Sequence, residues 1–223
     1  PAHLGDADGA SRDSERTHGD EMNDDRKHGL ASLIHVLGEP PRRGGAYLIY
    51  GRCGVGKSTL AMGMLCDSER SGHYISTEQP TADVWRQFSW MRNEKACPLV
   101  SATTAIKKID LAINAQKAVV YVIDSIFDID NTSPPAAARA LARLASERDV
   151  IIFATAYTNA EGGLFGGNRL RKHFANVLRL RAQGEATDPH RILETETTPR
   201  RRALFKMHEG RMLDCGPLPN EEA

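Results

Sequence analysis

Residues 51 to 58 have the types and spacing needed to hold a polyphosphate. The segment reads G-x-x-x-x-G-K-S, and its glycines lack the Cβ that would block a backbone curled around phosphate oxygens. Lys57 is placed to reach the β- and γ-phosphates, and the Ser58 hydroxyl can ligate Mg²⁺. A helix starting here would add partial positive charge. The segment predicts a nucleotide site formed by Gly51, Arg52, Cys53, Gly54, Val55, Gly56, Lys57, Ser58 and Thr59.

Two carboxylates follow apolar runs that read as buried strands. Glu78 ends the run 73–78, and Asp124 ends the continuous apolar run 118–124. Ligands of open α/β sheets sit at the carboxyl ends of the strands, so both side chains are expected near the phosphate segment. There Glu78 can polarise the water that attacks a γ-phosphate, although a solvent-exposed loop glutamate is the alternative. Asp124 matches the acid that holds Mg²⁺ in phosphate-loop enzymes.

Polar and basic residues mark three further stretches. The buried run 150–157 ends in Thr155 and Tyr157, again at the expected ligand edge, where Thr155 is expected to bind the nucleotide. The glycine-rich stretch 158–173 carries Phe165, which could stack on bases, and three cations that could contact phosphates, namely Arg169, Arg171 and Lys172. A loop followed by a solvated basic helix is the alternative. The third stretch is a predicted turn between two strands, and it holds Arg200, Arg201 and Arg202.

The order of the predicted strands and helices that position these residues indicates an α/β fold. An apolar strand at 46–50 enters the phosphate segment and a helix leaves it. Further helices are predicted at 29–37, 81–93 and 104–115, and one begins at Pro134 with Ser133 as its N-cap. The last four apolar segments, beginning near residue 175, read as strands with antiparallel connections. We expect a mainly parallel central sheet with helices on both faces and a C-terminal antiparallel extension.

Length and composition favour one domain with tails. The chain has 223 residues and a formal net charge of zero. Residues 1–28 hold eight acidic against four basic side chains, excluding His, and predict a disordered or partner-ordered polar tail. Residues 29–216 are predicted to form the core, and 217–223 a short tail. Residues 169–211 hold eleven basic against five acidic side chains, so any nucleic-acid surface is expected in this C-terminal third.

Cysteine spacing and hydropathy narrow the class of protein further. The four cysteines show no C-x-x-C pairing, which indicates neither a zinc site nor a secreted disulfide framework. No apolar run approaches the roughly 18 residues that a membrane span requires. We therefore expect a reduced protein of the cytoplasm, or a phage- or plasmid-encoded protein acting there, with no membrane partner.

The order of these parts resembles the RecA-like ATPase core, specifically the branch of RadA/Sms and the DnaB-type hexameric helicases. The resemblance runs from about Ser32 to Leu213 and rests on GRCGVGKSTL, YISTEQP, VVYVIDSI, FGGNRLRKHFANVLRL and RILETETTPRRRALFKM. It implies ATP and Mg²⁺ as cofactors, hydrolysis at the subunit interfaces of a hexameric ring or filament, and single-stranded DNA bound at the centre. Glu78 is the implied catalytic glutamate, and Asn168 joins the implied nucleic-acid contacts.

The chain departs from the pattern of that family at two places. The histidine and lysine usual in the strand before the DNA-contacting loop are replaced by ATAYTNAEGG. The lysine and arginine usual in the final hairpin do not align. The arginine that would reach the nucleotide of a neighbouring subunit, the arginine finger, is therefore one of Arg200, Arg201 and Arg202, and the sequence does not choose among them. The leading prediction is a nucleic-acid-dependent ATPase of the helicase or recombination-mediator type. A viral genome-packaging motor and a KaiC-like regulatory ATP-binding oligomer are the alternatives. The sequence also does not decide whether the bound nucleic acid is DNA or RNA, or in which direction translocation runs.

Overall fold

The computed structural model describes residues 30–67, 71–93, 97–130, 132–185, 187–197 and 199–219. The predicted polar tail at 1–28 lies outside the described residues. At the other end, regular structure continues to Leu218, beyond the predicted core boundary at 216.

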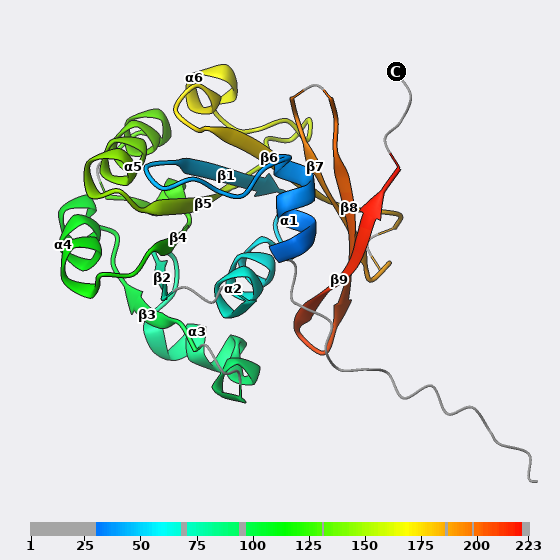
Figure 1. Cartoon of the computed structure of the whole chain (residues 1–223), viewed down its shortest axis with the longest axis horizontal. Coiled ribbons are helices and arrows are strands. Elements are labelled where there is room, and N and C mark those ends of the chain that lie inside the picture. The colour runs from blue at the N-terminus through cyan, green and yellow to red at the C-terminus, as the bar shows by residue number, and fades with distance from the viewer. Residues whose placement is uncertain are drawn as a thin grey trace, which may run out of the picture.

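One nine-stranded sheet forms the centre of the molecule, with the order β3-β2-β4-β5-β1-β6-β7-β8-β9 (Figure 1). The phosphate segment follows β1, which lies near the middle of this order and has a neighbouring strand on each side. The strands are β1 (Ala46–Gly51), β2 (Gly72–Ser76), β3 (Leu99–Ala102), β4 (Val120–Asp124), β5 (Ile151–Tyr157), β6 (Asn176–Ala182), β7 (His190–Thr195), β8 (Arg202–His208) and β9 (Arg211–Leu218).

The sheet has a parallel part from β3 to β6 and an antiparallel part from β6 to β9. β6 pairs parallel with β1, and only β7, β8 and β9 add antiparallel strands. The four C-terminal strands are therefore joined by antiparallel connections, as predicted, and the first of them, β6, is also the last strand of the parallel part of the sheet. A parallel neighbour needs a crossover segment, and the stretch between β5 and β6, which includes the short helix α6 (Gly167–Arg171), supplies it.

Helices cover both faces of the sheet, as the sequence predicted. The described α-helices other than α6 are α1 (Leu30–Leu37), α2 (Lys57–Asp67), α3 (Thr81–Gln87), α4 (Ile106–Gln116) and α5 (Pro134–Arg148). The predicted helix 81–93 is divided, because the chain leaves the α conformation at Phe88 and continues as the 3-10 helix η1 (Ser89–Asn93). Ser133 occupies the N-cap position of α5, but its side chain makes no capping hydrogen bond.

Successive side chains of β1 point to opposite faces of the sheet and belong to two different hydrophobic clusters. Tyr47 and Ile49 join the cluster that packs against α1, α2 and the antiparallel strands. Leu48 and Tyr50 join the cluster that packs against α4 and α5. Every residue of β1 is buried, as expected for a strand covered on both faces.

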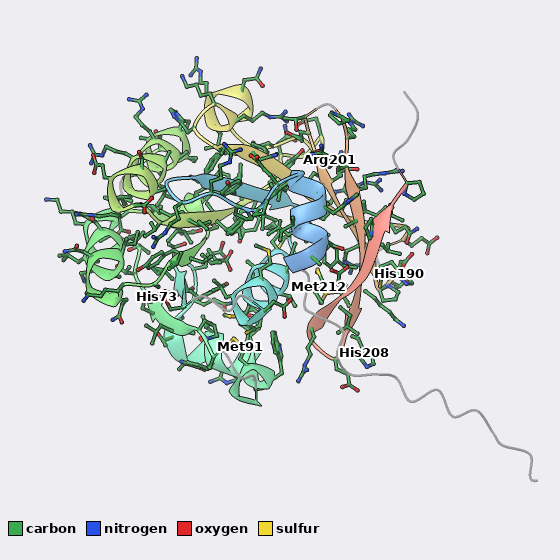
Figure 2. The ribbon with its side chains drawn as sticks, in the orientation of Figure 1. His73, Met91, His190, Arg201, His208 and Met212 are labelled. Atoms are coloured by element: carbon green, nitrogen blue, oxygen red, sulfur yellow. The ribbon has the colours of Figure 1, made fainter. Side chains whose placement is uncertain are left out.

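The antiparallel strands belong to the same core as the parallel sheet. Phe205 of β8 is fully buried in the cluster that includes α1 and α2. Met212 of β9 lies between that strand and α2 (Figure 2). The C-terminal extension therefore positions the beginning of α2 as well as closing the sheet.

We expect Phe205→Ala to lower the free energy of unfolding by about 3–5 kcal/mol, because it leaves a cavity in a core shared by both halves of the sheet. Urea denaturation followed by circular dichroism measures the change. Leu111→Ala is the matched control, since Leu111 is 66% exposed and its truncation should change the free energy by less than about 0.5 kcal/mol. Independent unfolding of the antiparallel strands, seen as two transitions, would contradict a shared core.

Candidate nucleotide-binding site

The phosphate segment connects the end of β1 to the start of α2. Gly54 and Gly56 have φ values of 75° and 100°, a region that side chains with a Cβ rarely occupy. A Cβ on Gly56 would also lie 2.7 Å from the terminal carbon of Met212. The space next to Gly54 is open within 4 Å of its Cβ position. The loop thus has the left-handed turns and the clearance that a backbone phosphate cradle needs.

Lys57 is the first residue of α2 and is only 6% exposed. Its Nζ donates hydrogen bonds to the carbonyl oxygens of Gly51, at 3.1 Å, and Arg52, at 3.0 Å. The same nitrogen lies 4.5 Å from the centre of the Tyr157 ring. Burial lowers the pKa of Lys57, and the negative charge of Asp124 acts in the opposite direction. The ammonium is therefore held at the loop by local carbonyls and an aromatic face.

Asp124 ends β4 and is 9% exposed. The Tyr74 hydroxyl donates to one of its carboxylate oxygens and the Thr155 hydroxyl to the other. Burial, followed by the charge of Asp124, raises the pKa of Tyr74, which keeps that hydroxyl protonated as a donor. Tyr74 also shares a hydrogen bond with Ser58. One tyrosine therefore contacts both predicted magnesium ligands.

Glu78 is exposed and lies just beyond the end of β2. The Tyr157 hydroxyl donates a hydrogen bond to its Oε1. Burial, followed by this hydrogen bond, raises the pKa of Tyr157. Thr77 joins the segment to β4, because its hydroxyl donates to the Ser125 carbonyl and accepts from the Ser125 N–H, both at 2.6 Å. Glu78 is thus anchored close to Asp124 along the same sheet edge.

Sequence reasoning did not assign a role to Tyr74 or Tyr157. Tyr74 lies inside a strand and reads there as a packing residue, so the sequence carries no signal for its contact with Asp124. Tyr157 was recognised as a polar group at the ligand edge, but its contacts with Lys57 and Glu78 depend on the side-by-side order of β1, β2, β4 and β5. Thr155, predicted to face the nucleotide, is fully buried and serves Asp124 instead.

The three arginines near the start of β8 have different surroundings. Arg201 donates from Nη1 to the Leu37 carbonyl at 3.2 Å and so lies against the end of α1 (Figure 2). Arg202 is the first residue of β8 and donates to the Pro219 carbonyl at 2.7 Å. Arg200 is exposed and has no hydrogen-bond or ion-pair partner among the described residues.

The basic residues after the glycine-rich loop do not form one uniform surface. Asn168, Arg169 and Lys172 are exposed. Arg171 is half-buried and forms an ion pair with Glu196 at 2.6 Å. That glutamate also accepts a hydrogen bond from the Tyr50 hydroxyl. Arg171 is consequently engaged within the chain.

An arginine-lined cavity of about 390 Å³ adjoins the other side of the phosphate segment. Its lining includes Arg179 and Arg181 of β6, both of which face the buried carboxylate of Glu194. Arg191, also in the lining, donates from Nε to the Val55 carbonyl at 3.0 Å and so braces the phosphate loop. The alternation in NVLRLRA could have placed Arg179 and Arg181 on one strand face from sequence alone.

Comparisons with known proteins agree with this architecture. No family model matches the chain. The DNA repair protein RadA of Helicobacter pylori (strain ATCC 700392 / 26695) is 28% identical over 187 residues, and RadA of Bacillus subtilis (strain 168) is 28% identical over 177 residues. Each alignment covers 74% of this chain. The chain spans 39% and 38% of the length of those relatives, respectively.

Solved structures show the same fold. The RadB recombinase has a TM-score of 0.62 at 18% identity, covering 85% of this chain and 99% of that one. A KaiC-like protein from Pyrococcus horikoshii OT3 has a TM-score of 0.68 at 16% identity, covering 87% and 98%. The chain therefore shares the α/β fold of these two structures, and the RadA relatives agree with the RecA-like resemblance of its motifs. In the part of the chain that the structure describes, each helix is too short or too polar to traverse a lipid bilayer.

We expect Thr155→Val to lower the free energy of unfolding by about 1–3 kcal/mol, because it removes one of the two hydroxyl donors to a buried carboxylate without changing side-chain shape. Thermal and urea denaturation measure the loss. Thr132→Val is a control of the same shape at a half-buried loop position outside the site. Equal stability of both variants would show that Asp124 does not depend on the Thr155 hydroxyl.

Proposed function

We propose that this chain is a nucleic-acid-dependent ATPase, which couples hydrolysis to movement along, or remodelling of, single-stranded DNA. The single observation that carries the proposal is the convergence of the phosphate loop, Asp124 and Glu78 at one edge of a RecA-like sheet. The RadA relatives, whose name describes a DNA repair protein, support the DNA assignment. The residues around 30–218 form the proposed motor core.

Each group at the edge has a chemical task in this proposal. The loop N–H groups and Lys57 hold the phosphates, since the open space at Gly54 and the left-handed loop glycines fit a phosphate chain. Ser58 and Asp124 would hold Mg²⁺, which offsets the charge of the phosphates. Tyr74 keeps these two ligands in register. Glu78 is the proposed base that orients and deprotonates the attacking water.

Assembly into a ring or filament is part of the proposal, because Glu78 and residues 52–54 of the phosphate segment are exposed, so a neighbouring subunit could reach the site. Of the three candidates, Arg200 is the one with no partner within the described chain, whereas Arg201 and Arg202 are bonded to backbone carbonyls. Arg200 is therefore the proposed finger that reaches a neighbouring subunit's γ-phosphate.

The proposed nucleic-acid surface combines the exposed part of the α6 region with the glycine-rich loop. Phe165, Asn168, Arg169 and Lys172 are exposed there. Arg171 contributes indirectly, since its ion pair with Glu196 fixes the end of α6 against β7. Phosphate contacts by arginine and lysine supply affinity, and an aromatic ring can stack on bases without sequence preference.

The deciding experiment measures ATP turnover and oligomeric state in one buffer, with and without single-stranded DNA, double-stranded DNA and RNA. We expect turnover that single-stranded DNA raises, and its loss in Lys57→Ala, because the phosphates then lose their main side-chain counterion. Lys57→Ala must keep the wild-type circular dichroism spectrum to be informative. ATP-driven assembly without any polymer-stimulated turnover would instead favour a regulatory nucleotide-binding oligomer.

Arg200→Ala should bind ATP as well as wild type and lower turnover by about 10³-fold or more, as loss of a finger does in related chemistry. A lysine control, Lys206→Ala on the exposed side of β8, should leave turnover unchanged. Mixed oligomers of wild type and Arg200→Ala should lose activity faster than the mutant fraction rises. A strictly proportional loss after subunit exchange would show that no residue is supplied by the neighbour.

A further inference from the structure

The loop after β5 is more closed than its glycine content suggested. Asn159 donates its N–H to the Gly163 carbonyl, and the Gly163 N–H donates to the Asn159 side chain, both at 2.8 Å. The Phe165 N–H then donates to the Tyr157 carbonyl at 3.2 Å. These bonds return the chain to the end of β5. Phe165 is therefore attached directly to the residue that contacts Glu78.

Three aromatic rings continue this attachment through side chains. The Tyr157 ring stacks on Phe127, with centroids 5.8 Å apart and an angle of 22° between the ring planes. Phe127 belongs to η2 (Ile126–Asp128), just after Asp124. Phe165 meets Phe127 edge-on, with centroids 5.4 Å apart and an interplanar angle of 81°. Phe165 is itself 52% exposed, so the series begins at solvent and ends at the catalytic edge.

At its inner end, Tyr157 contacts two groups that hydrolysis requires. Its hydroxyl donates to Glu78, and its ring lies 4.5 Å from the Lys57 ammonium. While this hydrogen bond persists, the Glu78 carboxylate is directed at the end of β5. A general base must reach the attacking water at hydrogen-bond distance. With Oε1 bonded to Tyr157, Glu78 can offer the water only Oε2, in the orientation that this hydrogen bond sets. The contact therefore restrains Glu78 in a position set by Tyr157.

We propose that Tyr157 restrains the catalytic glutamate and that nucleic acid bound at Phe165 releases it through Phe127. The inference rests on the proposed ATPase function and adds its regulation. Packed aromatic rings have few alternative arrangements. If a stacking base displaces Phe165, the Phe165 ring must therefore either move Phe127 with it or lose contact with Phe127. Tyr157, in contact with Phe127 and joined to Phe165 through its carbonyl, then shifts away from Glu78. Tyr157 is a positioning residue, because it acts through Glu78.

The test is Tyr157→Phe, which removes only the hydroxyl that holds Glu78. We expect turnover without nucleic acid to rise by about 3- to 10-fold, the equilibrium effect of one net hydrogen bond. The stimulation by saturating oligo-dT should fall by the same factor, and the affinity for oligo-dT should not change. Tyr121→Phe is the matched control, since it removes a tyrosine hydroxyl that donates to the Ile113 carbonyl, away from the site.

Two double variants test the order of events. Glu78→Gln combined with Tyr157→Phe should turn over as slowly as Glu78→Gln alone, because no carboxylate remains to be released. Phe165→Ala should reduce stimulation at saturating oligo-dT in the wild-type background and cause no further reduction with Tyr157→Phe. Leu99→Ala, which truncates a similarly exposed apolar side chain (48%), controls for the loss of surface. Independent effects of Phe165→Ala and Tyr157→Phe would overturn the connection.

Unchanged turnover and intact stimulation in Tyr157→Phe would also overturn the proposal. If the wild-type protein hydrolyses no ATP, the proposed function fails. The restraint of Glu78 by Tyr157 can then be tested by a measurement that does not depend on catalysis. Hydrogen–deuterium exchange of residues 158–166 is then compared with and without a non-hydrolysable ATP analogue and Mg²⁺. We expect the analogue to change exchange in wild type and not in Tyr157→Phe. The same response in both proteins would refute the restraint independently of the ATPase assignment.

Discussion

The parallel register of β1, β2, β4 and β5 is the constraint on which the candidate site depends. Because these strands run in one direction, their carboxyl ends meet at one edge of the sheet. Lys57, Glu78 and Asp124 come from distant parts of the chain and reach that edge only through this order. Side chains covering both faces keep water away from the strands, so the edge is left as the polar surface.

Tyrosine hydroxyls organise much of the chemistry at this edge. Tyr74 serves Asp124 and Ser58, and Tyr157 serves Glu78 while its ring faces Lys57. A tyrosine suits this position because its ring packs in the core while its hydroxyl satisfies a buried polar partner. These hydrogen bonds hold the charged groups at the edge in defined positions.

Charge on the opposite side of β1 is arranged differently. Glu194 and Glu196 each contact arginines on neighbouring elements, and Glu194 is 8% exposed. These ion pairs hold the arginines in defined positions. Around the cavity lined by Arg179, Arg181 and Arg191, the arginines outnumber the carboxylates that pair with them, so the net charge there is positive. The glycine-rich loop is joined to this network, since Arg179 donates to the Gly162 carbonyl at 3.5 Å. The two sides of the phosphate loop are thus connected through β1 and the loop after β5.

The sequence by itself determined the phosphate loop, the two carboxylates and the α/β class, because each depends on local spacing or on continuous apolar runs. Only the tertiary structure decided that β6 is parallel to β1, that Thr155 is buried against Asp124, and that Arg201 and Arg202 bond backbone carbonyls while Arg200 has no partner among the residues that the structure describes. These features depend on which strands are neighbours, and strand order is a long-range property that periodicity does not encode. The contact between Tyr157 and Glu78 joins residues 79 positions apart, so it exists only once β2, β4 and β5 have assembled.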